Sequence, residues 1–289
     1  MTPISLIALD LDGTLLNSNL QISRSNQQAI CTAINNGMEV IISTGRPYSR
    51  IPIDLLATLG VKYAITANGA AVYKLPEKEC IYADTLSLDT FLPIAQKLIR
   101  YDILFFAFTD GFAYSQANQY AVIEKMRETE TYKTFLRKAA APVPDIVAHL
   151  KEQALPVQKG SVNFYALKDG TYKDRKEVLA YLKSNPDLTC VNGGGINLEF
   201  TKAGVSKARG LAFLADYLSI SMRQTMAIGD SENDLDIITA AGVGVAMANA
   251  APQVKSMADY VTLTNDEDGV HHAFRKFNII KDDDFAPKF

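Results

Sequence analysis

Short apolar segments alternate with amphipathic ones at the start of the chain, and this alternation constrains the fold more than any other feature. Strands are expected at Ile4–Asp10, Met38–Thr44 and Lys62–Gly69. Helices are expected between them, at Ser23–Gly37 with a serine N-cap and a glycine stop, and at Pro47–Gly60 with proline in the first turn. Because these strands are apolar almost throughout, they predict a parallel sheet that is covered by helices on both faces.

The same alternation returns after residue 205, so both ends of the chain are needed to complete one sheet. The expected elements there are helices at Ser206–Leu218, Glu232–Gly242 and Pro252–Met257, strands at Thr225–Asp230, Val243–Met247 and Asp259–Leu263, and a last helix to about Phe277. We therefore predict an α/β fold with a Rossmann-like, doubly wound parallel sheet formed by residues 1–83 and 191–289. Residues 84–190 are predicted to be an inserted α/β domain that serves as a lid.

Composition argues against nucleic acids and membranes as partners. The 289 residues carry a formal net charge of −3, and the nearest approach to a basic cluster, Lys133, Arg137 and Lys138, indicates a solvated helix face. The longest apolar runs, such as Ile103–Phe108, are far shorter than the roughly 20 residues that span a bilayer. No signal peptide is apparent, and the three cysteines form no CxxC pair, which indicates reduced thiols in a cytoplasmic protein.

The first strand contains two aspartates in the stretch LIALDLDGTLL. Asp10 and Asp12 stand two residues apart, so a strand that continued through both would place them on one face. Neighbouring carboxylates repel each other unless a cation or a shared proton lies between them. A strand that ends in a solvated turn is the alternative, since Asp, Gly and Thr are ordinary turn residues.

A second acidic stretch, IGDSENDLD, follows a later strand. It places Asp230 at the end of that strand, with Asn233 and Asp234 in the first turn of the next helix. An acidic helix start that favours the helix dipole would account for Glu232 and Asp234. It does not account for an aspartate at the strand end, so this stretch favours a functional site.

These residues are expected to meet, because open α/β sheets bind ligands at the carboxyl ends of their strands. Asp10, Asp12 and Asp230 lie at such ends, and so do Thr44 and Gly45 after the second strand. Carboxylates that converge need a cation, and oxygen ligands select a hard ion, for which Mg²⁺ is the natural candidate. No GxxxxGK[ST] phosphate loop and no plausible Ser/His/Asp set is present.

The motifs together resemble a known family. DxDGT at 10–14, STGRP at 43–47, VSKARG at 205–210 and GDxxND at 229–234 resemble the haloacid-dehalogenase-type (HAD) phosphotransferases over nearly the whole chain. The spacing, the segment TANGA at 66–70 and the large insertion are similar to the Cof-type phosphatases, which carry a C2B-type cap. The resemblance implies a Mg²⁺-dependent phosphoric monoester hydrolase of small phosphorylated metabolites, with sugar phosphates expected first and broad specificity.

The resemblance also implies roles for single residues. Asp10 would be the nucleophile that forms an aspartyl-phosphate, and Asp12 would protonate the leaving group and later deprotonate the attacking water. The Asp10 carboxylate, the Asp12 backbone carbonyl and Asp230 would bind Mg²⁺, while Asp234 would hold ligand waters. The phosphate oxygens would be held by Thr44, the Gly45 N–H and Lys207, with Asn233 close by and Arg46 facing either the phosphate or the cap.

Two other functions stay open on the sequence. A phosphomutase of the same superfamily would retain the phosphoenzyme and return the phosphate to the sugar. A non-enzymatic phospho-aspartate switch would also phosphorylate an aspartate beside Mg²⁺, although the inserted domain and the general-acid candidate Asp12 argue against it. The sequence leaves the oligomeric state and the physiological substrate undetermined.

Overall fold

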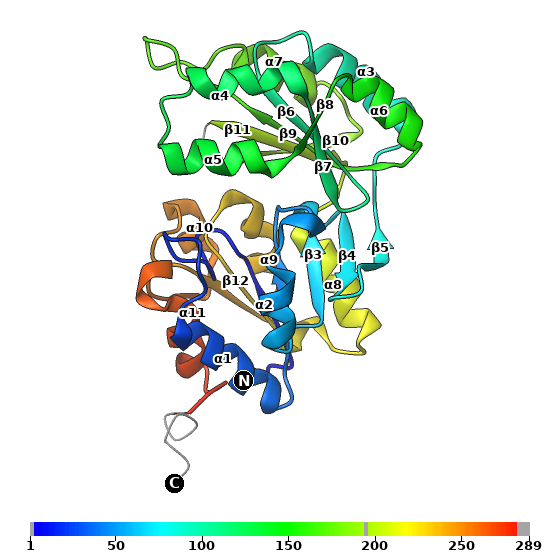
Figure 1. The fold of residues 1–289 in the computed structure, drawn as a ribbon. Coiled ribbons are helices and arrows are strands. Elements are labelled where there is room, and N and C mark those ends of the chain that lie inside the picture. Colours follow the sequence, from blue (N-terminus) through cyan, green and yellow to red (C-terminus); the bar gives the residue numbers. More distant parts are fainter. Residues whose placement is uncertain (1–2, 194–195, 282–289) are drawn as a thin grey trace. The chain divides into compact units, whose positions relative to one another are not determined.

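The structure is a computed structural model that describes residues 3–193 and 196–281, and it divides into two compact units (Figure 1). The core unit comprises the chain up to Gly45, Pro52–Tyr82 and the chain from Ser206 onward. The inserted unit comprises Arg46–Ile51 and Ala83–Val205. Each is a mixed α/β body with its own sheet.

The core unit is built on an eight-stranded sheet in the order β14-β13-β12-β1-β2-β3-β4-β5. Neighbouring strands from β14 to β3 are parallel, whereas β3 and β4 are antiparallel. The predicted parallel sheet is therefore confirmed, with strands added at one edge that the sequence did not indicate. The strands are β1 (Leu6–Leu9), β2 (Glu39–Ser43), β3 (Tyr63–Thr66), β4 (Ala71–Lys74), β5 (Glu79–Ala83), β12 (Thr225–Gly229), β13 (Val243–Ala246) and β14 (Tyr260–Val261).

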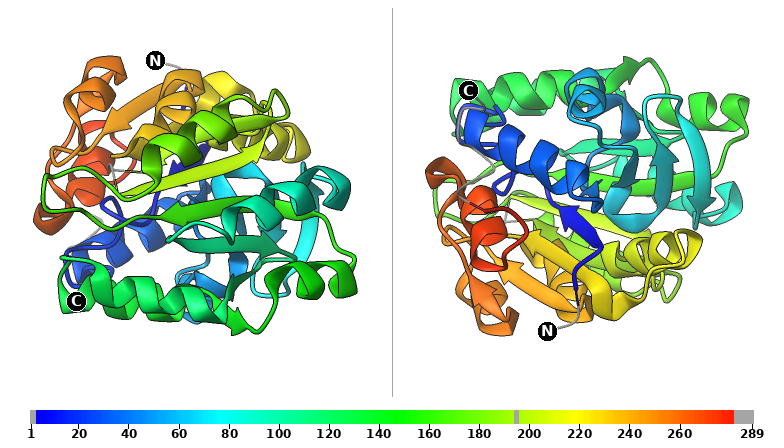
Figure 2. Two further views of the ribbon diagram at one scale, coloured as in Figure 1. Left: turned by 90° about the horizontal axis from the view of Figure 1, so that it is seen from above. Right: turned by 90° about the horizontal axis from the view of Figure 1, so that it is seen from below.

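Helices cover both faces of this sheet, as the apolar strands predict. On one face, Leu6 and Ala8 of β1 pack with the buried residues of α8 and α9. On the other, α1 contacts β2 and α11, and Figure 2 shows α1 (blue) and α8 (yellow) on opposite sides of the sheet. The helices are α1 (Arg24–Asn35), α2 (Ile53–Thr58), α8 (Lys207–Tyr217), α9 (Leu235–Ala240), α10 (Pro252–Met257) and α11 (Gly269–Lys276), with short 3₁₀ turns that include η2 (Ala67–Gly69) and η5 (Glu232–Asp234).

The inserted unit has a six-stranded sheet in the order β10-β11-β9-β6-β7-β8. Its core contains a stack of Phe91, Phe105 and Phe200, whose ring centroids lie 5.8–6.4 Å apart. Its elements are α3 (Leu88–Leu98), β6 (Leu104–Thr109), β7 (Phe112–Gln116), α4 (Ala121–Lys125), α5 (Glu130–Ala139), β8 (Ala141–Val143), α6 (Ile146–Gln153), β9 (Val157–Asn163), α7 (Arg175–Lys183), β10 (Leu188–Gly193) and β11 (Asn197–Lys202).

The inserted unit extends further along the chain than the sequence predicts. The expected boundary at residue 190 falls inside β10, whereas the unit runs to Val205. The cause is β11, which pairs antiparallel with both β10 and β9 and so completes this sheet. The short segment Arg46–Ile51 also belongs here, and the Ser49 N–H donates to the Gly111 carbonyl at 2.9 Å.

No helix in the described part of the chain is long and apolar enough to cross a membrane. The longest, α1, has 12 residues, against the roughly 20 that a bilayer requires. The cytoplasmic location stays a prediction.

Candidate active site

Three carboxylates lie together at the carboxyl ends of two neighbouring parallel strands. Asp10 follows β1, and its N–H donates to the Ile228 carbonyl of β12 at 3.0 Å. Asp230 follows β12, and Asp234 ends the 3₁₀ turn η5 that leads into α9. One carboxylate oxygen from each residue lies within 4.8 Å of the other two. Asp10 and Asp234 are buried and Asp230 is partly buried, so the three charges share a poorly solvated space.

A buried lysine holds two of these carboxylates. Lys207, the first residue of α8, is 0% exposed, and its Nζ donates to Asp10 Oδ1 and Asp234 Oδ1, each at 2.6 Å. Burial lowers the pKa of Lys207, but the two carboxylates outweigh it and raise that pKa above its ordinary value. The side chain is therefore a fixed positive charge at the centre of the cluster.

The environment disfavours a negative charge on Asp10 and Asp230. Burial raises the pKa of Asp10 well above its ordinary value, Lys207 opposes this shift, and the charges of Asp234 and Asp230 add to it. Burial, with the charge of Asp234, raises the pKa of Asp230 to about 6. Carboxylates that repel each other in a buried site favour binding of a cation, which would relieve both causes of these shifts.

The hydrogen bonds show which oxygens could bind a cation. Asp234 Oδ2 accepts from the N–H groups of Asp230 (3.1 Å) and Ser231 (3.0 Å), and its Oδ1 accepts from Lys207, so Asp234 is almost fully engaged. Among the described residues, Asp230 accepts hydrogen bonds only from neutral hydroxyls, those of Thr14 and Ser231. Asp10 Oδ2 accepts no hydrogen bond from the described residues. The oxygen donors of Asp10 and Asp230 fit a hard divalent cation, while Asp234 fits an organising role.

Two glycines allow the backbone to approach these carboxylates. Gly13 has φ +81°, and a Cβ there would lie 2.5 Å from Asp230 Oδ2. A Cβ at Gly229 would lie 2.4 Å from Asp234 Cγ. The loop after β1 and the end of β12 can therefore pass this close to the cluster only with glycine at these positions.

A second set of polar residues lies at the end of β2. Thr44 is buried directly after this strand, followed by the partly buried Gly45, and the Thr44 carbonyl accepts from the Asn68 N–H at 3.2 Å. Asn233 Nδ2 donates to Asn68 Oδ1 at 3.1 Å. Asn68 therefore links two of the residues that the sequence assigned to the phosphate.

Asp12 and Arg46 differ from the other expected site residues. β1 ends at Leu9, so Asp10 and Asp12 both lie beyond the strand and strand alternation does not determine where Asp12 points. Asp12 is exposed and its carboxylate is not one of the clustered three. Arg46 belongs to the inserted unit, where its Nη1 donates to the Arg50 carbonyl at 2.9 Å and its guanidinium lies 5.8 Å from the centroid of the Phe135 ring.

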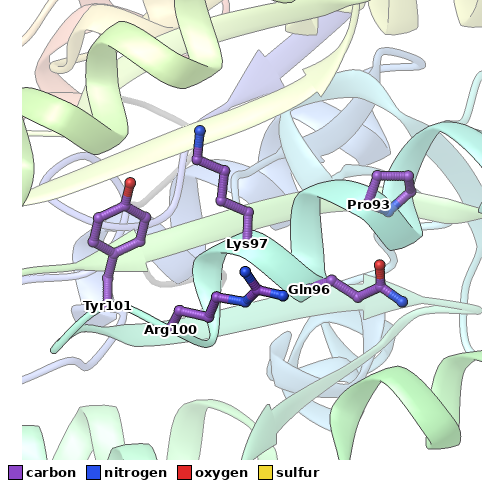
Figure 3. A pocket seen from close by; sticks show the side chains of 5 residues that line it. All are labelled: Pro93, Gln96, Lys97, Arg100 and Tyr101. Atoms are coloured by element: carbon purple, nitrogen blue, oxygen red, sulfur yellow. The ribbon is translucent and has the colours of Figure 1, made fainter.

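A hollow lies in the inserted unit. It encloses about 400 Å³ beside α3 and is lined by Pro93, Gln96, Lys97, Arg100 and Tyr101 (Figure 3). The lining has no carboxylate and none of the expected catalytic residues. The candidate site is therefore the carboxylate cluster of the core unit.

Comparisons with known proteins agree with this choice. The sequence profile of the haloacid dehalogenase-like hydrolases matches residues 7–274. This chain belongs to that family. Among relatives of this haloacid dehalogenase-like hydrolase, the phosphatase YwpJ of Bacillus subtilis is 32% identical, over 94% of this chain and 99% of the relative.

Two further matches support the family assignment. The 5-amino-6-(5-phospho-D-ribitylamino)uracil phosphatase YcsE of B. subtilis is also 32% identical, over 94% of this chain and 95% of the relative. The solved structure of a haloacid dehalogenase-like hydrolase from B. subtilis superposes with a TM-score of 0.80 and 30% identity, over 93% of this chain and 98% of that one. The family expected from the motifs and the α/β fold are confirmed, and the chain is a phosphatase of this family.

Sequence reasoning did not identify three residues that support the site of this haloacid dehalogenase-like hydrolase. Thr14 and Ser231 bond the Asp230 carboxylate, and Asn68 bonds Asn233. Thr14 lies inside the DxDGT motif and Ser231 inside GDxxND, so each was next to an identified residue. For Asn68 the signal was the Asn-Gly pair in TANGA, which is typical of a left-handed turn.

Proposed function

We propose that this haloacid dehalogenase-like hydrolase is a Mg²⁺-dependent phosphatase of small phosphorylated metabolites that acts through an aspartyl-phosphate on Asp10. The observation that carries the proposal is the burial of Asp10 and the hydrogen bonding of its two carboxylate oxygens. It is buried, Lys207 fixes its Oδ1, and its Oδ2 has no partner among the described residues. A carboxylate held in this way is oriented for attack on phosphorus.

The reaction proceeds in two transfers. An Asp10 oxygen forms a bond to phosphorus as the ester P–O bond breaks, and Asp12 gives its proton to the departing alkoxide. Asp12 then takes a proton from water, which attacks phosphorus, releases inorganic phosphate and restores the Asp10 carboxylate. The exposed position of Asp12 suits a group that exchanges protons with a leaving group and with water.

The phosphate and the cation are held by separate groups. Thr44, the Gly45 N–H, Lys207 and Asn233 hold the phosphate oxygens, with Lys207 supplying the positive charge. The Asp10 carboxylate, the Asp12 backbone carbonyl and Asp230 would hold the cation, near Asp234. When bound, Mg²⁺ reduces the repulsion between a carboxylate nucleophile and a phosphate dianion.

The deciding experiment is phosphate release from a panel of sugar phosphates, nucleotides and cofactor phosphates, with Mg²⁺ and with a chelator. Sugar phosphates are expected to be the best group. The panel includes 5-amino-6-(5-phospho-D-ribitylamino)uracil, because YcsE is named for that substrate. Release that needs Mg²⁺ supports the proposal. A long-lived phosphate on Asp10 without release from any compound would favour the phosphomutase or the phospho-aspartate switch.

Replacing Asp12 with alanine tests the proton-transfer role. We expect kcat to fall by about 10²–10⁴-fold, the usual contribution of general acid–base catalysis. The fall should be larger for an alkyl phosphate than for p-nitrophenyl phosphate, whose leaving group needs less protonation. Mg²⁺ affinity, measured by calorimetry, should be kept because the Asp12 metal contact is its backbone carbonyl. Unchanged kcat on the alkyl phosphate would contradict this role.

The raised pKa of Asp230 predicts how Mg²⁺ binding depends on pH. Since its pKa is about 6 in the metal-free protein, protons compete with the cation below that pH. We expect the Kd for Mg²⁺ to rise as pH falls below 6, by about ten-fold per pH unit from Asp230 alone, and the raised pKa of Asp10 adds to this dependence. Calorimetric titrations between pH 5 and 8 measure this. Asp230→Asn should weaken binding and flatten the dependence, and a flat profile in the wild type would contradict the prediction.

A further inference from the structure

We propose that Asn68, which none of the expected roles includes, is a positioning residue that orients the phosphate-binding amide of Asn233. The inference rests on the proposed function, because it assumes that Asn233 contacts the phosphate. It is carried by three features of the turn η2: its backbone conformation, its bond to Asn233 and its contact with the start of α8.

The backbone at Asn68 is held in an uncommon conformation. Asn68 has φ 59° and ψ 29°, the left-handed region, and it is only 4% exposed. Residues other than glycine are strained there, although asparagine tolerates this region better than most. The Asn68 N–H donates to the Thr44 carbonyl at 3.2 Å, so the turn is fixed to the end of β2.

The side chain of Asn68 determines which way the Asn233 amide faces. Asn233 Nδ2 donates one hydrogen to Asn68 Oδ1 at 3.1 Å, which leaves its second amide hydrogen for another acceptor. Asn233 Oδ1 is buried and has no hydrogen-bond partner among the described residues. Without the Asn68 Oδ1 acceptor this hydrogen bond is lost, and it would no longer hold the Asn233 amide with its nitrogen, rather than its oxygen, toward Asn68. An amide oxygen facing a phosphate would repel it.

The next residue fits the turn against the helix that carries Lys207. Gly69 has φ +97°, and a Cβ there would lie 2.0 Å from the Ser206 carbonyl oxygen and 2.9 Å from the backbone nitrogen of Lys207. Ser206 is the N-cap of α8, and its side chain accepts from the Arg209 N–H. The turn η2 therefore contacts the elements that carry Thr44, Asn233 and Lys207, three residues assigned to the phosphate.

The test separates the Asn68 side chain from its backbone. Asn68→Gly keeps the left-handed conformation available but removes the acceptor for Asn233. We expect kcat/KM to fall about ten-fold, with a parallel rise in the inhibition constant of inorganic phosphate, as loss of one oriented hydrogen bond implies. Asn278→Gly is the matched control, because Asn278 is also left-handed (φ 56°), is exposed and follows α11. It should leave both constants unchanged.

A double variant shows whether Asn68 acts through Asn233. If it does, Asn68→Gly combined with Asn233→Ala should be no worse than Asn233→Ala alone. Fully additive losses would overturn the inference, and so would an Asn68→Gly enzyme within two-fold of an active wild type. A wild type that releases no phosphate would instead overturn the proposed function. Thermal unfolding of each variant shows whether a loss of activity reflects a loss of fold.

Discussion

Replacing Asp10 with asparagine should abolish turnover while leaving the fold intact. The amide is a poor nucleophile, and loss of an essential nucleophile typically lowers kcat by about 10⁴-fold or more. The amide oxygen of the new side chain could still accept the Lys207 hydrogen bond, which is 2.6 Å long in the wild type. The substitution also removes one negative charge from a buried cluster whose members repel, so the free energy of unfolding should be unchanged or higher.

Phosphate release and thermal unfolding, measured side by side, check this result. Asp54→Asn is the matched control, because Asp54 is an exposed acid in the first turn of α2, and the same chemical change there should leave turnover unchanged and lower the free energy of unfolding by no more than about 1 kcal/mol. Acid-quenched enzyme should carry a labile phosphate in the wild type but not in Asp10→Asn. An Asp10→Asn enzyme that keeps a tenth of the wild-type rate would rule out Asp10 as nucleophile.

The strands and the carboxyl ends that carry the site could be predicted because both depend on local patterns. A run of apolar residues identifies a strand that is buried on both faces, and the polar residues that follow mark the edge where ligands bind. The helix Pro252–Met257 was predicted with its observed bounds, since proline favours the first turn. The predicted N-cap Ser23 likewise accepts a hydrogen bond from the Asn26 N–H in the following turn.

The sequence did not indicate which distant segments pair with one another. β11 alternates the apolar Leu198 and Phe200 with polar residues, which is typical of a strand, but this pattern does not say which of the two sheets it joins. Lys207 would be expected on the surface of an amphipathic helix, yet it is fully buried because Asp10, 197 positions away, and Asp234 take its charge. Burial of a lysine depends on such partners, and the hydrophobic periodicity of its own helix does not identify them.

Of the substitutions proposed for the core unit, replacing Lys207 with methionine should produce the largest loss of stability. Methionine keeps much of the volume but removes the charge that Asp10 and Asp234 share, which leaves two buried carboxylates without a cation. Breaking a buried ion pair on one side typically costs about 3–5 kcal/mol, and we expect a loss of that size at pH 8 without metal. Phosphate release should also fall sharply, because the proposed site loses its lysine contact to the phosphate.

The loss should depend on pH in a direction that the Asp10 carboxyl determines. Its pKa is raised by burial, and Lys207 is the charge that opposes this shift, so the variant should have an Asp10 pKa that is higher still. A carboxyl whose pKa is higher folded than unfolded binds more protons when folded, so the free energy of unfolding falls as pH rises between the two values. The deficit of Lys207→Met should therefore be smaller near pH 5 than near pH 8, as measured by urea unfolding.

Mg²⁺ should restore part of this stability, which distinguishes a charge effect from a packing effect. A divalent cation can replace the missing positive charge beside Asp10, and any ligand that binds only the folded state stabilises it. Lys159→Met is the matched control, because Lys159 is 1% exposed and its Nζ lies 2.6 Å from Glu199 Oε1 in the inserted unit, outside the carboxylate cluster. Its deficit should not respond to Mg²⁺. If Mg²⁺ did not stabilise Lys207→Met at all, the metal would not be bound by the carboxylates that Lys207 holds.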